Sequence, residues 1–364
     1  MAIDFKPSGF QRLAPLTARV VLGVFAAFTI VCVATTLSPL VIDNTRVEHE
    51  GEGDIPLYWA DIKRMRAGES YYEALSHELR PRGYPTKSVF NWRSPLPVWL
   101  VAKLPDPGGR VLLCIATAGV FVYGFRILER EGGVGAILLG MPLLFGSLAP
   151  VWMGDLYVVT ELWGGVFIAL SLCSYGVDRR LMGVTTGIAA QFARELSCVY
   201  TVIAMCLACR ARRWKELAGW TLGMAVYAAY WYQHYVNVQP WIRPDDLAHH
   251  HGWVRFNALP FILATAHMNC LLLAFPQWVI GFYFPLAMLG LASWSTPTGT
   301  RFGLTMAGYV VFFGIVGQSF NQYWGALHAP LLCFGFAMAP AALRDLWHAA
   351  QLGTAGRRAT IPAA

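Results

Sequence analysis

The sequence has little charge for its length. Of its 364 residues only 13% are Asp, Glu, Lys or Arg, whereas 56% are hydrophobic. A soluble domain carries about 25% charged residues, so this chain has too few to cover a surface that faces water. The low charge excludes a soluble globular domain and predicts an integral membrane protein, with one membrane domain over residues 1–350.

The sequence also lacks paired cysteine motifs with zinc spacing. Its 8 cysteines all lie in or at the ends of apolar segments. Cys206 and Cys209 form a C-x-x-C, but no second pair accompanies them. The cysteines are therefore interpreted as small buried hydrophobic residues rather than metal ligands.

An excess of acidic residues is absent as well, since the formal net charge is +7. The basic residues stand in short clusters between apolar runs, which is typical of membrane proteins whose Lys and Arg set orientation. This distribution argues against a nucleic-acid partner and makes the lipid bilayer the expected one.

A cleavable signal peptide is not indicated either. Lys6, Arg12 and Arg19 precede an apolar run from about Val20 to Ile42. That run is longer than the apolar part of a signal peptide and long enough to cross a bilayer. We expect a retained first helix whose N-terminus is cytoplasmic.

Long apolar runs occupy most of the chain and predict an all-α polytopic bundle with about ten membrane crossings. A crossing needs about 20 apolar residues. The predicted spans are 18–41, 109–128, 133–151, 157–176, two arms within 181–209, 214–235, 276–293, 302–319 and 325–346. Residues 257–275 are interpreted as an interfacial or partly inserted helix.

Two long polar segments, 43–94 and 236–256, interrupt the apolar runs. The short loops between the other spans carry most of the Lys and Arg, which marks them as cytoplasmic. Alternation then places both polar segments on the non-cytoplasmic side and both termini inside. Residues 351–364 are expected to form a disordered cytoplasmic tail.

Segment 181–209 begins and ends at basic clusters of the cytoplasmic type, so it has to enter and return. Each arm is then about 13 residues, roughly 20 Å, which is short of a 30 Å hydrocarbon core. We expect a short hairpin whose tip, with Arg194 and Glu195, points into a polar cavity. The alternative is one long tilted helix that reverses the topology downstream.

The first outer loop carries a series of acidic residues just beyond the first helix. The last of this series is Asp54, and Asp61 follows it. A helix is predicted over 56–67, because proline suits a first turn, Asp54 can cap it and Gly68 can end it. On that helix Tyr58, Ile62 and Met65 share a face. A loop helix lying on the membrane explains the aromatic residues but not the acids.

These residues resemble the GT-C glycosyltransferases, most closely the bacterial polyprenyl-phosphate-sugar transferases, mannosyltransferase-like ones included. The resemblance lies in Asp54-x-x-x-Tyr58 and Gly68-x-x-Tyr71 of the first outer loop. It also includes SVFNWRSPLPVWLVAKLP at 88–105, Asn321-Gln322-Tyr323-Trp324, and Ala329-Pro330. In that family an Asp or Glu of this loop is the catalytic base. The chain departs from the family in lacking a clear Asp-Glu pair and a large soluble outer domain.

The resemblance implies transfer of a sugar from a polyprenyl-phosphate donor to a glycan or lipid acceptor. The expected location is the outer face of a bacterial inner (plasma) membrane. Such a reaction needs a carboxylate to deprotonate the acceptor and cations to hold the phosphate. Asp54 is the first candidate base, followed by Asp61 and by Asp155. Asp61 can instead be a solvated partner of Lys63 or Arg64, and Asp155 a helix cap.

Cationic candidates for the donor phosphate are Arg194, Arg255, Arg243 and Arg93. Ionisable residues at membrane depth are rare and usually functional, which favours Arg194 with Glu195. Glu161, in an apolar helix, is a possible partner of Arg194. The alternative for Arg194 and Glu195 is a structural ion pair, and for Arg243 and Arg255 an interfacial loop.

Candidate substrate contacts are Tyr58, Glu161, Glu195, Tyr323 and His328, although a buried His is more often structural. No cofactor is certain, and a divalent metal stays open, since His249, His250 and His251 follow Asp245 and Asp246. A rival interpretation is a transporter or flippase of a lipid-linked or small polar substrate. It would need polar residues in several spans, whereas here they gather at outer ends and one hairpin tip.

Overall fold

The computed structural model describes residues 4–37, 53–248, 252–256 and 258–358. In this part of the chain the secondary structure is helical, and the only β pairing is an isolated bridge between Val254 and Val316. The predicted all-α class is therefore confirmed. The α-helices are α1 Pro15–Leu37, α2 Asp54–Arg66, α3 Tyr71–Leu79, α4 Pro95–Lys103, α5 Gly108–Glu131, α6 Val134–Leu148, α7 Thr160–Gly176, α8 Arg180–Ala193, α9 Cys198–Arg210, α10 Trp214–Val238, α11 Ala258–Ala266, α12 Ile280–Ser293, α13 Pro297–Ile315 and α14 Ala329–Arg358.

Helix α7 is the centre of the bundle. Every residue of α7 except Phe167 is buried, and the helix packs against α5, α8, α13 and the 3₁₀ segment η9 (Ser319–Leu327). A helix that is apolar on all sides belongs inside a large core. Glu161 lies in the first turn of α7, so the central position of this helix places a glutamate in the interior of the bundle.

Four described segments are long and apolar enough to cross a membrane by themselves: Pro15–Leu37, Gly108–Glu131, Val134–Val151 and Ala329–Gln351. They agree with four of the predicted spans and make this a membrane protein. The other predicted spans form helices that are shorter or less apolar, among them Gln277–Ser293. The predicted number of ten crossings therefore stays a prediction.

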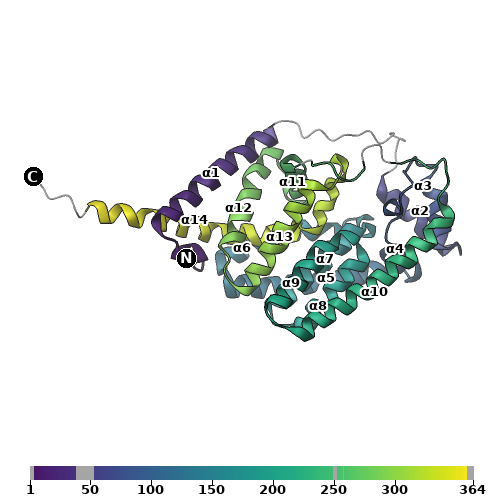
Figure 1. Ribbon diagram of the computed structural model, residues 1–364, viewed down its shortest axis with the longest axis horizontal. Coiled ribbons are helices and arrows are strands. Elements are labelled where there is room, and N and C mark those ends of the chain that lie inside the picture. The colour runs from purple at the N-terminus through teal and green to yellow at the C-terminus, as the bar shows by residue number, and fades with distance from the viewer. Residues whose placement is uncertain (1–3, 38–52, 249–251, 257, 359–364) are drawn as a thin grey trace, which may run out of the picture.

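Helices α1, α12 and α14 pack together on the side of the molecule where the chain ends (Figure 1). Helix α14 continues to Arg358, beyond the expected boundary at residue 350. The described residues 258–275 contain the short helix α11 and no helix long enough to span a membrane, so their interfacial or partly inserted position stays a prediction.

The segment between the basic clusters at 180 and 210 folds as the expected hairpin. Helix α8 ends at Ala193, Arg194 is extended (φ −150°, ψ 126°), and α9 begins at Cys198 after one 3₁₀ turn. A continuous helix through 185–205 is thereby excluded. The two arms have 14 and 13 residues.

The described part of the first outer loop contains α2 and α3, which form a small helical unit with the following helix α4 at the end of the molecule opposite the C-terminus (Figure 1). Tyr58, Ile62 and Met65 form its buried face, as predicted. Gly68 follows the helix with φ +108°, a conformation that glycine adopts without strain. Helix α3 was not predicted, although its capping box of Ser70 and Glu73 is visible in the sequence.

The two outer polar segments contact each other. The Arg80 guanidinium donates to the carboxylate of Asp246 with an Nε–Oδ1 distance of 2.9 Å, and the Lys87 amide donates to the Leu247 carbonyl at 3.1 Å. The described parts of the two segments, 53–94 and 236–248 with 252–256, therefore lie at the same end of the molecule, as predicted. Which side of the membrane they face stays a prediction.

Candidate active site

Asp54 stands at the first position of α2, where its side chain leaves the helix. The Tyr84 hydroxyl donates to Oδ1 at 2.7 Å, and an Arg93 amino group pairs with Oδ2 at 3.2 Å. The expectation that Asp54 caps the helix is wrong, because Gly53 occupies the cap and α2 has no side-chain cap bond. The carboxylate is instead oriented by two residues that lie much later in the outer loop.

Arg93 connects Asp54 to the last outer segment. Its guanidinium is buried and also donates to the Tyr323 hydroxyl at 3.1 Å, which in turn accepts from the Asn321 amide at 3.2 Å. Burial alone would lower the pKa of Arg93, but Tyr323, Tyr58, Asp54 and Glu161 hold it well above its ordinary value. Arg93 is therefore a permanent cation at this position.

Tyr58 contributes a buried hydroxyl to the same group. Burial raises the pKa of Tyr58, and its charged neighbours are Arg93, Glu161, Asp54 and Arg194. Its hydroxyl has no hydrogen-bond partner in the part of the chain that the structure describes. A buried hydroxyl without a partner is unfavourable by about 1–3 kcal/mol.

Arg194, at the break between α8 and α9, holds two carboxylates. Its Nε lies 3.0 Å from Glu161 Oε1, and one of its amino groups lies 3.0 Å from Glu195 Oε1. The Thr160 hydroxyl donates to the second oxygen of Glu161 at 3.0 Å. Arg194 and Glu161 are buried, whereas the Glu195 side chain is 19% exposed.

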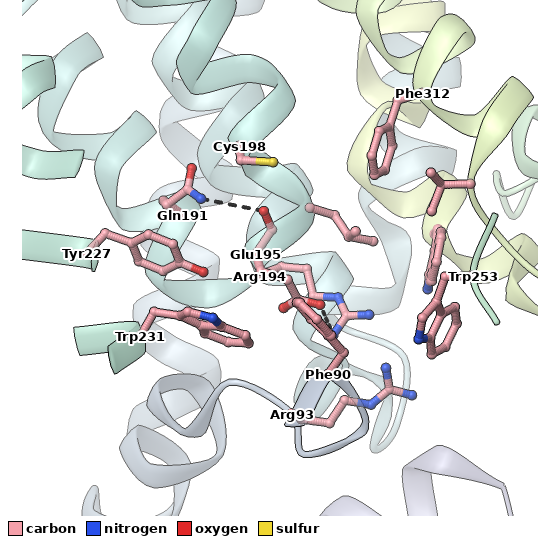
Figure 2. Close-up of a pocket in the computed structure, with 13 residues that line it drawn as sticks. Phe90, Arg93, Gln191, Arg194, Glu195, Cys198, Tyr227, Trp231, Trp253 and Phe312 are labelled. Carbon is pink, nitrogen blue, oxygen red and sulfur yellow. Dashed lines mark hydrogen bonds and ion pairs between the residues drawn. The ribbon is translucent and has the colours of Figure 1, made fainter. Parts of the chain in front are cut away.

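A cavity of about 380 Å³ opens beside this cluster. Figure 2 shows Arg93, Arg194 and Glu195 along one part of its wall, with aromatic rings on both sides and Gln191 and Cys198 beside them. The hairpin tip thus faces a cavity, as predicted, but the expected polar lining is wrong. The aromatic lining residues are Phe90, Tyr227, Trp231, Trp253, Phe312 and Trp324.

Asp61 lies apart from the cavity. It is fully buried within the outer-loop unit, where its charged neighbours are Glu78, Arg82 and Arg64. The alternative of a solvated ion-pair partner is wrong for this residue. Neither Asp54 nor Asp61 is among the residues that line the cavity, but Asp54 is ion-paired to Arg93, which does line it.

The remaining sequence candidates do not line the cavity among the described residues. Asp155 is exposed and precedes a 3₁₀ turn without a side-chain cap bond. Arg243 and Arg255 are exposed. His328 is buried beside Thr265, with its Nε2 3.2 Å from the Thr265 hydroxyl, and packs on the rings of Tyr309 and Phe313.

A metal site cannot be assigned to the described residues, since they contain no group of three His, Cys, Asp or Glu side chains able to hold an ion. His249, His250 and His251 lie outside the described residues, and so do the loop acids before Gly53. A divalent metal therefore remains a possibility raised by the sequence alone.

Sequence reasoning did not identify several residues of this site. Tyr84, which orients Asp54, has no distinguishing motif. Tyr227 and Trp231 belong to an aromatic stretch of α10 that also contains the exposed Tyr232 and Tyr235. Tyr227 and Trp231 are four positions apart, so the sequence indicates that they share a face of α10. It does not indicate whether that face contacts lipid or a cavity.

The described chain is an all-helical membrane bundle. A helical outer-loop unit follows its first span, and a buried charged cluster lies beside that unit. This fold is GT-C-like. Among solved structures the chain is similar to ArnT from Cupriavidus metallidurans bound to undecaprenyl phosphate, with a TM-score of 0.51. The sequence identity is 13%, and the match covers 93% of this chain and 63% of that one. The resemblance read from the sequence is thereby confirmed for the fold.

The same ArnT in its apo state matches with a TM-score of 0.48 and 14% identity, over 95% of this chain and 66% of that one. Neither a protein-family model nor a curated protein matches the sequence. This chain spans 63% of the length of ArnT as solved with its lipid. The similarity to the lipid-bound ArnT structure therefore shows the fold of this chain and not its reaction.

Proposed function

We propose that this protein is a glycosyltransferase that moves a sugar from a polyprenyl-phosphate donor to a hydroxyl of a glycan or lipid acceptor. The reaction would take place at the outer face of a bacterial inner membrane. One observation carries the proposal: two buried arginines stand in the wall of a mostly apolar cavity rich in aromatic residues, and one of them is ion-paired to Asp54.

The two kinds of wall suit the two parts of such a donor. Aromatic rings offer apolar surface for an isoprenoid chain and flat faces for a sugar. Arg93 and Arg194 offer guanidinium groups, which bind phosphate oxygens through charge-assisted hydrogen bonds. A small free sugar phosphate would leave most of the aromatic wall without a function.

The chemistry requires one base and a stabilised leaving group. The acceptor hydroxyl attacks the anomeric carbon, the bond from that carbon to the phosphate oxygen breaks, and the polyprenyl phosphate departs with the bonding electrons. Asp54 takes the hydroxyl proton. Tyr84 and Arg93 orient Asp54, and Arg93 and Arg194 stabilise the departing phosphate.

The fold supports the same class of donor. ArnT, which shares this fold, was solved with undecaprenyl phosphate bound. In both chains a lipid phosphate would approach from the bilayer, since a polyprenyl chain cannot leave it at low energetic cost.

The test is transfer by the purified protein from labelled polyprenyl-phosphate sugars, with release of polyprenyl phosphate as the readout. Asp54→Asn keeps the shape of the side chain and removes its basicity, so turnover should fall by about 10²-fold or more. Asp155→Asn, at an exposed position outside the cavity, is the matched control and should turn over normally.

Near-normal turnover of Asp54→Asn together with a dead Asp61→Asn or Asp155→Asn would move the base to that residue. Full activity of all three variants would exclude base catalysis by these carboxylates. If the wild-type protein transfers no sugar but moves lipid-linked substrate across liposomes, the protein is a transporter.

A further inference from the structure

The charged cluster at the cavity carries more negative than positive charge. The guanidinium groups of Arg93 and Arg194 face the carboxylates of Asp54, Glu161 and Glu195. With all five groups ionised, two positive charges meet three negative ones. A phosphate anion entering this wall would meet an unfavourable net charge, although both arginines are positioned to bind it.

The two carboxylates on Arg194 are not equivalent. Glu161 is 0% exposed, belongs to the central helix α7 and accepts a hydrogen bond from Thr160. It does not line the cavity among the described residues. Glu161 is therefore a fixed partner that holds the guanidinium in place.

Glu195 is the exchangeable partner. It lines the cavity, its side chain is 19% exposed, and it lies in a single 3₁₀ turn between two short helices. Its Oε2 atom is buried and has no hydrogen-bond partner within the described parts of the chain. In Figure 2 the carboxylate lies at the cavity wall and pairs with Arg194.

We infer that Glu195 occupies the position on Arg194 that the donor phosphate takes, and that the incoming phosphate displaces it. This inference rests on the proposed function and specifies the state of its site before the donor binds. Displacement removes one carboxylate from the guanidinium at the moment one phosphate arrives, so the charge on Arg194 stays compensated throughout. Glu161 keeps its place on Arg194 throughout, so this buried guanidinium always has a counter-ion.

A neutral polyprenol leaves Glu195 in place, because an uncharged head group does not compete with a carboxylate for Arg194. The displacement is therefore confined to the phosphate form of the lipid, and the competition by Glu195 lowers the affinity of the wild-type protein for that form alone.

Binding measurements test this inference without requiring transfer. The probes are undecaprenyl phosphate and undecaprenol in detergent micelles, titrated into the full-length purified protein. Glu195→Gln and Glu195→Ala should each bind undecaprenyl phosphate about tenfold tighter or more than the wild type, because no charge competes for Arg194. Their affinity for undecaprenol should stay unchanged.

Glu161→Gln is the matched control, since it removes the same charge from the same arginine without vacating the cavity wall. It should change the affinity for undecaprenyl phosphate far less than the Glu195 variants do. Equal tightening by both substitutions would show a simple effect of net charge and overturn the inference. Unchanged or weaker binding by folded Glu195 variants would overturn it as well.

The outcome also separates this inference from the proposed function. Binding of undecaprenyl phosphate by the wild type, without a gain in the Glu195 variants, rejects the displacement alone. If neither the wild type nor any variant prefers undecaprenyl phosphate to undecaprenol, the proposed donor class is wrong and the displacement falls with it.

Discussion

Asp61 is a carboxyl group that the fold keeps away from water. Both of its oxygens are buried and have no hydrogen-bond partner in the described part of the chain. Burial, together with the nearby Glu78 carboxylate, raises the pKa of Asp61 to about 8 against the opposing effect of Arg82 and Arg64. At neutral pH this group is therefore mostly protonated and uncharged.

The stability of the outer-loop unit should consequently depend on pH. In the unfolded chain Asp61 loses its proton near pH 4, at about its ordinary pKa. Between that value and the folded value of about 8, only the folded state keeps the proton. The stabilising contribution is complete below pH 4 and is lost as the pH rises toward 8, by about 1.4 kcal/mol per pH unit.

Thermal unfolding in detergent at pH 5 and pH 8 checks this prediction. The wild-type midpoint should fall over that interval, and the midpoint of Asp61→Asn, whose side chain does not titrate, should fall much less. Asp155→Asn, at an exposed carboxylate, should behave as the wild type. Parallel pH profiles for the wild type and Asp61→Asn would contradict the assignment.

At the scale of single residues, the sequence predicted site residues best where a charged residue stands in an apolar segment. Arg194 and Glu161 stand in apolar segments, where an ionisable group needs a partner, and the structure pairs them. Asp61 was not separable from Asp54 in this way, because both lie in a polar loop. Which of two loop carboxylates is buried depends on how α2 packs against α3, and that packing has no local signature.

At the scale of helices, the break at Arg194 shows how tertiary contacts can end a helix. Neither proline nor glycine stands at this position, yet the chain becomes extended there. The spacing of the basic clusters predicted the break from the width of a bilayer. At the break Arg194 pairs with Glu161 and Glu195, and the pairing with Glu161 could not be predicted without the position of α7.

Close packing between α7 and η9 leads to a prediction at this scale. A Cβ atom on Gly165 would overlap the backbone carbonyl of Ala326, whereas one on Gly23 of α1 would meet nothing within 4 Å. Gly165→Ala should therefore destabilise the protein by about 1–3 kcal/mol. Gly23→Ala, which only adds a good helix former, should leave the unfolding midpoint unchanged or slightly higher.

Thermal unfolding of the two variants in the same detergent distinguishes the cases. The Gly165→Ala protein should also bind undecaprenyl phosphate less well, because η9 carries Tyr323 and Trp324, which contact Arg93 and line the cavity. Equal midpoints for both variants would mean that α7 and η9 do not pack as closely as the structure has them.

At the scale of the whole molecule, the contact between the two outer segments constrains the topology. Arg80 and Asp246 pair although 166 positions separate them in sequence, and both lie at the end of the bundle where the cavity is found. The hydrophobic runs predicted this arrangement because each crossing reverses the side of the chain. They did not reveal the number of crossings, since α8, α9, α11 and α12 have only 14, 13, 9 and 14 residues and are shorter than a bilayer requires.

Orientation in the membrane is the last prediction. Lys63 of the first outer loop and Asp245 of the second are exposed, and so is Arg212 in the basic turn between α9 and α10. If the basic turn is cytoplasmic, single cysteines at Lys63 and Asp245 should react in intact cells with a maleimide that cannot cross membranes. A cysteine at Arg212 should react only after the membrane is opened. The exposed native Cys206 and Cys209 are first replaced by serine.

Labelling of Lys63→Cys and Asp245→Cys from opposite sides would reject the shared outer face, and with it the site at which donor and acceptor meet. Labelling of Arg212→Cys alone in intact cells would keep the fold but reverse it in the membrane, so that the Asp54 side of the cavity would open to the cytoplasm.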